Sequence, residues 1–355
     1  MTGSIDRPLR IALIGGGHGL AMALSGLRRS DVSVTAIVST ADDGGSSGRL
    51  RAMLGGHAPG DARRCLLALS DGSLLGSALE RRFDSGELSG HVVGNLLIAA
   101  LADTAGDFAG ALDEVGRLLG SRGRVLPASL EPVDLGALTS RGPVEGEVSV
   151  SSSGIVRRVW VEPAEAHAHP ESLAAIATAD TIVFGPGSLF TSVLAALMVP
   201  GIVDALERSP ARRVYVCNVA PQRNETDGLD AADHLDALLS HRVPVDVMLV
   251  DSSSVLPLGS PARPVIDRQV SASNGHSHDP DRLGDVLVEI ARSRWTAARV
   301  PSPDVSPSGR LALGVTKKSD DGFGTESGQG HTGPPLWTEC CAAMGWGESR
   351  LGFSR

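Results

Sequence analysis

The sequence predicts an α/β fold, a Rossmann-like arrangement of three layers around a mostly parallel sheet, with a small β-rich excursion. Short apolar runs alternate with helically spaced apolar residues from residue 9 to about 298, and glycine-rich turns follow two of the runs. We expect one nucleotide-binding domain over residues 9–298, with the excursion at 121–165. The Ser, Pro, Gly and Asp content after residue 299 is typical of a low-complexity, disordered tail, 299–355.

The first apolar run, residues 11–14, predicts a short buried strand, and leucines at 20, 24 and 27 predict a helix. The turn between them holds five candidate ligand-binding residues: Gly15, Gly16, Gly17, His18 and Gly19. Glycines let a backbone turn sharply and approach a ligand closely. Free N–H groups and the dipole at a helix start favour an anion, so this turn is predicted to hold phosphate. His18 alone is weak evidence for catalysis.

A second predicted strand, residues 34–38, leads into a run of acids, glycines and serines. Its candidate ligand-binding residues are Asp42, Asp43, Gly44, Gly45, Ser46 and Arg49. Paired acids beside a phosphate can hold Mg²⁺, which needs only one or two carboxylates, or can meet ribose hydroxyls. An acid followed by two glycines is also an ordinary turn, so three readings of Asp42 and Asp43 stay open. Arg49 would neutralise phosphate charge.

These motifs differ from the common nucleotide fingerprints. Leu20 stands where G-x-G-x-x-G requires its third glycine, and the acids lie later than the usual offset of about 20 residues. No Lys-Ser/Thr follows the glycines, which excludes a P-loop. A dinucleotide-dependent oxidoreductase is therefore the weakest of the functions considered.

The rest of the domain continues the alternation. We expect a helix around Cys65, a polar connection over 70–90, and a helix from Asn95, whose side chain would cap the helix or face the ligand. The excursion is expected to contain short strands at 124–126, 146–150 and 156–161. The other expected elements are helices at 108–119, 172–179, 188–198, 231–239 and 281–292, and strands at 181–184, 213–217 and 245–250.

A second glycine turn follows the strand expected at 181–184, and its candidate residues are Gly185, Gly187 and Ser188. Ser188 would cap the next helix or donate to a phosphate. The loop after the strand at 213–217 adds Asn218, Glu225, Thr226 and Asp227, which would read a sugar or a base. Capping of the following helix by Thr226 or Asp227 is an equally open reading. Because parallel strands end at one edge of a sheet, both turns are expected at one crevice.

Composition limits the remaining possibilities. A net charge of −9 and 3% aromatic residues argue against nucleic acid as a partner. No stretch approaches 18 apolar residues and no signal-peptide pattern begins the chain, so we expect no membrane insertion and a cytoplasmic location. No spacing typical of a nucleophile with its base is present, so catalytic residues stay unassigned and a protein that binds without turnover is favoured.

Taken together, these residues resemble the YvcK-type gluconeogenesis-factor family, which is related to the 2-phospho-L-lactate transferase CofD. The segments that carry the resemblance are IGGGHGL (14–20), TADDGGSSGRLR (40–51), PGDARRCLLALSD (59–71), GHVVGNLLIAAL (90–101), FGPGSLFTSVLAALMVPGI (184–202) and VYVCNVAPQRNETDGLDAADHL (214–235). They span about 10–292, and no counterpart is expected for the tail after residue 300.

The resemblance implies a cytoplasmic regulatory protein that binds UDP-sugars, including UDP-N-acetylglucosamine. It also implies a requirement for growth and normal cell shape on gluconeogenic carbon sources, and a homodimer. The CofD branch implies the alternative, a Mg²⁺-dependent transferase that moves a phospholactyl group to a deazaflavin in coenzyme F420 synthesis. Mg²⁺, held by Asp42 and Asp43, is thus the one cofactor considered.

Overall fold

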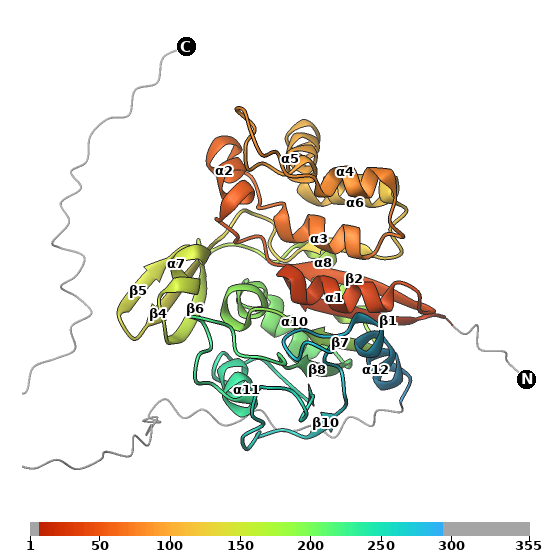
Figure 1. Ribbon diagram of the computed structural model, residues 1–355, viewed down its shortest axis with the longest axis vertical. Coiled ribbons are helices and arrows are strands. Elements are labelled where there is room, and N and C mark those ends of the chain that lie inside the picture. Colours follow the sequence, from red (N-terminus) through yellow and green to blue (C-terminus); the bar gives the residue numbers. More distant parts are fainter. Residues whose placement is uncertain (1–6, 294–355) are drawn as a thin grey trace, which may run out of the picture. The chain divides into compact units, whose positions relative to one another are not determined.

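The structure, a computed structural model, describes residues 7–293. The expected tail, 299–355, lies outside these residues. A seven-stranded sheet has the order β10-β9-β8-β7-β1-β2-β3, and every neighbouring pair is parallel. Figure 1 labels β1, β2, β7, β8 and β10 of this sheet. Its strands are β1 (Leu9–Gly15), β2 (Val32–Val38), β3 (Arg124–Pro127), β7 (Thr181–Phe184), β8 (Arg212–Val216), β9 (Val247–Val250) and β10 (Val265–Asp267).

Strand β1 lies where the chain changes direction across the sheet. From β1 the chain adds β2 and β3 on one side, and later adds β7 to β10 on the other. In open α/β sheets such a switch point leaves a crevice at the carboxyl ends of the two strands. The position of any ligand cleft is therefore set by the topology, between the ends of β1 and β7.

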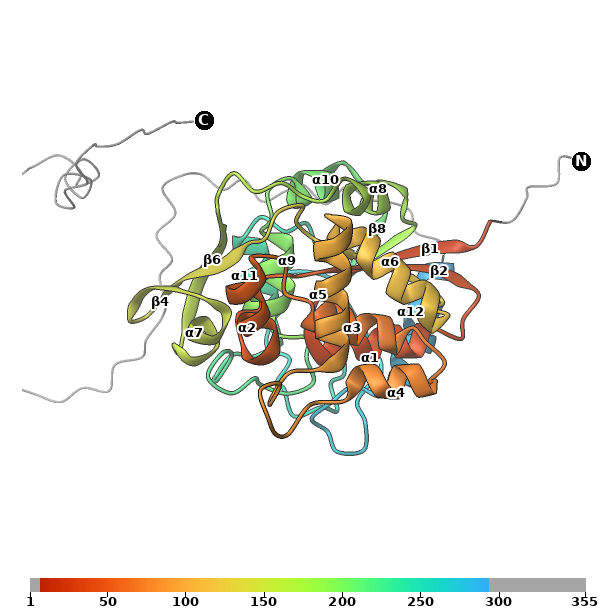
Figure 2. The ribbon, with the colours of Figure 1, turned by 90° about the horizontal axis from the view of Figure 1, so that it is seen from above.

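Helices cover both faces of the sheet. Ile11 and Leu13 pack with one helical layer, and the alternate residues Ala12 and Ile14 pack with the other, as the period of a strand requires. The first layer contains α1 (Gly17–Leu27), α3 (Gly60–Ala68), α6 (Phe108–Leu119) and α12 (Pro280–Arg292). The second contains α8 (Pro170–Thr178), η1 (Leu189–Leu194), α9 (Ala195–Leu197), α10 (Ile202–Arg208) and α11 (Ala231–Ser240). Figure 2 shows α8 and α10 across the sheet from α1 and α3.

Three further helices pack outside the first layer: α2 (Gly45–Leu54), α4 (Leu74–Glu80) and α5 (Val93–Ala105). Helix α2 begins inside the acid-glycine run, and α4 lies in the segment expected to be a polar connection. Ser73 caps α4 by accepting a hydrogen bond from the N–H of Gly76 at 3.0 Å. A serine that looked like part of a polar loop is therefore the N-cap of a helix. Strand β10 and helix α10 were likewise not expected.

The β-rich excursion is a small antiparallel sheet of order β5-β4-β6, formed by β4 (Asp134–Thr139), β5 (Gly142–Glu145) and β6 (Val156–Glu162). The strand expected at 146–150 is wrong, because helix α7 (Glu147–Ser152) occupies this stretch after Gly146, whose φ is +91°. The strand expected at 124–126 exists as β3 but pairs with β2 in the main sheet. The short apolar patterns of this segment could not show that 147–152 is a helix or that 124–127 belongs to the main sheet.

Helices α1 and α12 cross with their backbones in contact. A Cβ atom on Gly26 would lie 1.9 Å from the carbonyl oxygen of Pro280, and one on Gly284 would lie 2.5 Å from the carbonyl carbon of Gly26. Only glycine fits at such a crossing. Leu283 and Leu287 of α12 and Leu20 and Leu24 of α1 belong to one buried cluster, so the last described helix completes the layer that the first helix begins.

Within residues 7–293, no single helix is both long and apolar enough to cross a membrane, whereas η1–α9 and α10, bent by 70°, meet the length and composition criteria only as a pair.

Candidate functional site

A cavity of about 470 Å³ lies beside the ends of four neighbouring strands. Its walls include Gly16 after β1, Ser39 after β2, Pro186 after β7 and Asn218 after β8. Eight residues predicted from sequence line it: Gly16, Gly17, His18, Gly19, Asp42, Gly187, Ser188 and Asn218. Gly15 ends β1 and Gly185 follows β7, with φ of +158° and +74°. Neither glycine lines the cavity. The two turns therefore meet at one cleft.

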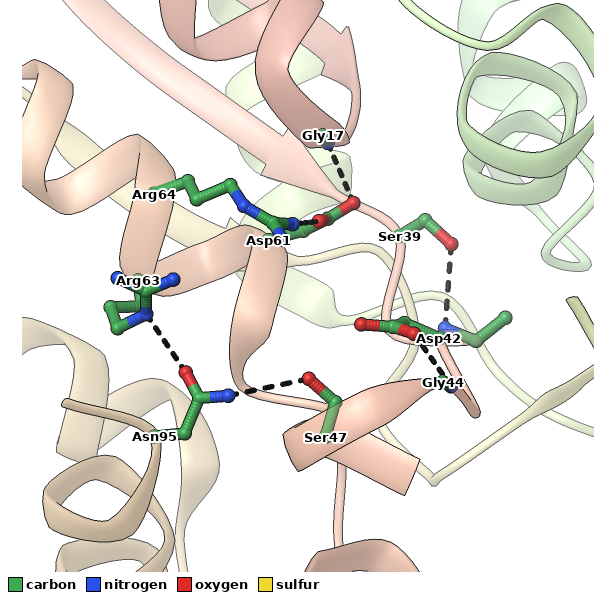
Figure 3. A network of polar contacts seen from close by, with 10 residues as sticks. Gly17, Ser39, Asp42, Gly44, Ser47, Asp61, Arg63, Arg64 and Asn95 are labelled. Atoms are coloured by element: carbon green, nitrogen blue, oxygen red, sulfur yellow. Dashed lines mark hydrogen bonds and ion pairs between the residues drawn. The ribbon is translucent and has the colours of Figure 1, made fainter. Parts of the chain in front are cut away.

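The first turn differs from the expected free phosphate site because a carboxylate already occupies it. The N–H of Gly17 donates to Oδ2 of Asp61 at 2.6 Å, and Nη1 of Arg64 donates to Oδ1 at 2.5 Å (Figure 3). Both Asp61 and Arg64 come from α3 and line the cleft. Among the described residues the N–H groups of His18 and Gly19 have no such acceptor, so part of the helix start stays open.

Asp42 and Asp43 do not act as a pair. Asp42 lines the cleft while its Oδ1 accepts from the N–H of Gly44 at 2.8 Å. Oδ1 of Asp43 instead accepts from the N–H of Val148 in α7 at 3.0 Å, and Asp43 is not among the cleft residues. No group of three or more His, Cys, Asp or Glu side chains in residues 7–293 is arranged to hold a metal. A magnesium ion would therefore depend on Asp42 and on oxygens of the ligand.

Three carboxylates of the cleft come from three separate segments: Asp42, Asp61 and Glu147. Burial raises the pKa of Asp61; Arg64 opposes this shift and Asp42 adds to it. Burial, with Asp42 and Asp43 nearby, raises the pKa of Glu147 to about 7. Burial and the charge of Arg64 lower the pKa of His18, which favours the neutral imidazole. Because Asp42 adds to the raised pKa of both Asp61 and Glu147, we call this end of the cleft, formed by these three carboxyl groups, its acidic end.

The second turn is closed by amide side chains. The N–H of Gly187 donates to Oδ1 of Asn218 at 3.2 Å, and the N–H of Leu189 donates to Oε1 of Gln222 at 3.1 Å. Nε2 of Gln222 donates to the hydroxyl of Ser188 at 2.7 Å, while Ser188 makes no side-chain cap of the helix. This end of the cleft is lined by neutral groups that both donate and accept hydrogen bonds.

Glu225 also stabilises the second turn, although it does not line the cleft. Its Oε1 accepts from the N–H groups of Phe190 at 2.7 Å and Thr191 at 3.1 Å, and the side chain is buried. Thr226 accepts from the N–H of Gln222, and Asp227 accepts from the N–H of Asn224. Neither caps the next helix, because Asp230 does so in a capping box with Asp233. These three predicted residues hold the loop in place without lining the cleft.

The other predicted residues outside the cleft lie on α2, just before it, or on α5. Gly44 and Gly45 begin α2, and Ser46 is buried against His91, 3.3 Å from its Nδ1. Arg49 is exposed and donates to the carbonyl of Ser89 at 2.9 Å. Asn95 is buried inside α5 and neither caps it nor reaches the cleft, because its Oδ1 accepts from Nε of Arg63 at 2.8 Å (Figure 3).

Sequence reasoning missed several cleft residues. Asp61 and Arg64 follow a Pro-Gly pair at a helix start, a signal that could have marked them as facing a ligand. Glu147 lies in the segment read as a strand, and His276 and His278 lie in the loop before α12. His278 donates from Nε2 to the carbonyl of Cys217 at 3.1 Å, with its pKa lowered to about 4 by burial. Only the folded chain brings these residues together.

Known proteins are similar to this chain in sequence and in fold. The family model of CofD, described as 2-phospho-L-lactate transferase, matches residues 11–292. The gluconeogenesis factor of Halalkalibacterium halodurans is 48% identical over 65% of this chain and 73% of its own. That of Bacillus subtilis is 44% identical over 69% and 80%. The crystal structure of a UPF0052 family protein from Bacillus halodurans has a TM-score of 0.76 at 39% identity, covering 79% of this chain and 99% of that one.

One expectation about the tail is wrong. The alignment with a relative from Mycobacterium leprae covers 93% of this chain and 98% of that protein, at 37% identity, and so continues past residue 300. The resemblance inferred from the motifs is confirmed, because the family model spans nearly all the described residues and the relatives match over most of their length. The chain belongs to the CofD family, within which its relatives are gluconeogenesis factors.

Proposed function

We propose that this chain binds a UDP-sugar in the cleft and acts without turnover, as a cytoplasmic regulator of cell shape and of growth on gluconeogenic carbon. The observation that carries the proposal is the convergence of two glycine turns on one cavity at the switch point of the sheet. The N–H groups of His18 and Gly19, which have no acceptor within residues 7–293, and the guanidinium of Arg64 are suited to a diphosphate. Asn218 and Gln222 are suited to polar groups of a nucleoside.

The described cysteines support binding without covalent chemistry. Cys65 and Cys217 are both buried. Burial raises the pKa of the Cys65 thiol well above its ordinary value and that of Cys217 to about 12. The imidazole of His234 lies 3.6 Å from the Cys217 sulfur, but burial lowers its pKa to about 4. Thiol and imidazole are therefore both neutral, and neither cysteine is an activated nucleophile.

The test is calorimetric titration with UDP-N-acetylglucosamine in EDTA, using a matched pair of arginine variants. Arg64→Ala removes the cation of the cleft, and we expect affinity to fall about tenfold, the value of one charge-assisted hydrogen bond. Arg49→Ala removes an exposed arginine outside the cleft, and we expect affinity within about twofold of the parent.

Equal losses in the two variants, or a larger loss in Arg49→Ala, would place the phosphate at α2 instead of at the cleft. No heat of binding with the parent protein, with or without Mg²⁺, would refute the proposal itself.

A Mg²⁺-dependent transferase of the 2-phospho-L-lactate type is the second candidate. The description of the matching family model favours it, as do the carboxylates of Asp42, Asp61 and Glu147 at one cleft. Asp42 would hold the ion together with ligand phosphates, and the ion would supply positive charge to a transferring group. Nucleotide binding that needs Mg²⁺ and is lost in Asp42→Asn, with the fold intact, would favour the transferase.

A further inference from the structure

We infer that Asp61 is a specificity residue, which keeps a free terminal phosphate out of the first turn and so selects a diphosphate that is esterified to a sugar. The inference rests on the proposed function, because it concerns how the same cleft tells one nucleotide from another. It also fixes an orientation, with the sugar at the acidic end.

The first step is the position of the carboxylate. Oδ2 of Asp61 lies 2.6 Å from the N–H of Gly17, and a Cβ atom added to Gly16 would lie 2.4 Å from the same oxygen. The carboxylate therefore rests against the backbone of the turn, in the place where a helix start binds a phosphate oxygen. Asp61 is only 9% exposed, so water screens its charge weakly.

The second step is the balance of charge around Asp61. The groups that face it are Arg64 on its own helix, Asp42 from the loop after β2, His18 from α1, and Glu147 from α7, and Arg63 acts from further away. Arg64 is already hydrogen-bonded to Asp61, and His18 is held neutral by burial and by Arg64. Three acids, Asp42, Asp61 and Glu147, therefore share this end of the cleft with Arg64 and the more distant Arg63, so acids outnumber cations there.

The third step concerns which groups of a ligand the acidic end of the cleft can bind. A terminal phosphate brings negative charge toward Asp42 and Asp61, and like charges in a partly buried site repel strongly. Sugar hydroxyls bring donors, which carboxylate oxygens accept. Esterification of the terminal phosphate both removes charge and adds donors. The neutral end, formed by Asn218, Gln222 and Ser188, is then left for the nucleoside.

The experiment compares UDP-N-acetylglucosamine with UDP in EDTA, by calorimetry, on the parent, Asp61→Asn and a control, Asp31→Asn. Asp31 is an exposed acid at the amino end of β2, outside the cleft. We expect the parent to prefer the sugar nucleotide at least about tenfold, and Asp61→Asn to reduce this preference to about threefold, chiefly through tighter binding of UDP. The control should keep the parental ratio.

Equal affinities in the parent, or an unchanged ratio in Asp61→Asn, would overturn the inference while leaving the proposed function standing. Failure of both nucleotides to bind the parent would overturn both. If Asp61→Asn does not fold, Asp42→Asn removes a second cleft carboxylate from a loop, and an unchanged ratio there is equally damaging. UDP binding that appears only with Mg²⁺ and is lost in Asp42→Asn would make the carboxylates metal ligands instead.

Discussion

The two glycine turns follow neighbouring strands and face one cleft, yet they are completed in different ways. In the first, an aspartate from α3 accepts the N–H of Gly17 and an arginine accompanies it. In the second, amide oxygens of Asn218 and Gln222 accept the N–H groups, and a glutamate accepts two more from behind. One strand–glycine–helix pattern therefore yields a charged end and a neutral end. The pattern locates a site, and residues from elsewhere in the chain decide its chemistry.

The largest effect is expected where the two turns touch. A Cβ atom on Gly19 would lie 2.6 Å from the carbonyl oxygen of Pro186 and 2.7 Å from Cα of Gly187. Gly19→Ala must push one turn from the other, and we expect it to lower the free energy of unfolding by about 3 kcal/mol, the upper part of the range for overpacking. Chemical denaturation measures the change.

Gly56→Ala is the matched control, because a Cβ atom there would meet nothing within 4 Å. If Gly19→Ala is as stable as Gly56→Ala, the two turns are not in backbone contact and the comparison between them loses its geometric basis.

The stability of the second turn should depend on the hydrogen-bond acceptor that Glu225 provides more than on the charge of its side chain. Glu225→Ala leaves the N–H groups of Phe190 and Thr191 buried without a partner, which we expect to cost about 2 kcal/mol of unfolding free energy. Glu225→Gln keeps an acceptor oxygen at the same place, so its loss should be clearly smaller. Denaturation of the two variants side by side distinguishes an acceptor from a charge, and equal losses would contradict this account.

The smallest effect concerns the acidic end and depends on pH. The pKa of Glu147 is about 7 in the folded chain, against an ordinary value of 4.5. Between these values the unfolded chain holds fewer protons at this position, so the contribution of Glu147 to stability is present at low pH and is lost as pH rises through about 7. Glu147→Gln should therefore melt a few degrees above the parent at about pH 8 and match it near about pH 4.5.

Glu145→Gln is the control for this prediction, because Glu145 is exposed on β5. A constant difference in melting temperature between parent and Glu147→Gln at both pH values would show that Glu147 is not held in an acidic environment.

The sheet was largely predictable because its central strands are buried on both faces. Strands β1, β7 and β9 therefore read as apolar runs, and the turns after β1 and β7 as glycine motifs. The excursion was harder, because Gly146 with its positive φ turns an apparent strand into α7. Arg49 and Arg64 illustrate the limit for the site. Both follow glycines, and only the packing of α2 and α3 decides that Arg64 lines the cleft while Arg49 does not.

The crossing of α1 and α12 has a consequence for synthesis on the ribosome. Helix α1 emerges early, but the glycine surface at Gly26 is covered only when residues 280–292 have been made. Contacts between the two ends of a chain close a long loop and form late in folding. A nascent chain therefore carries the first half of the cleft on an incompletely covered helix until α12 has been made. The cleft is finished only after that helix has packed against α1.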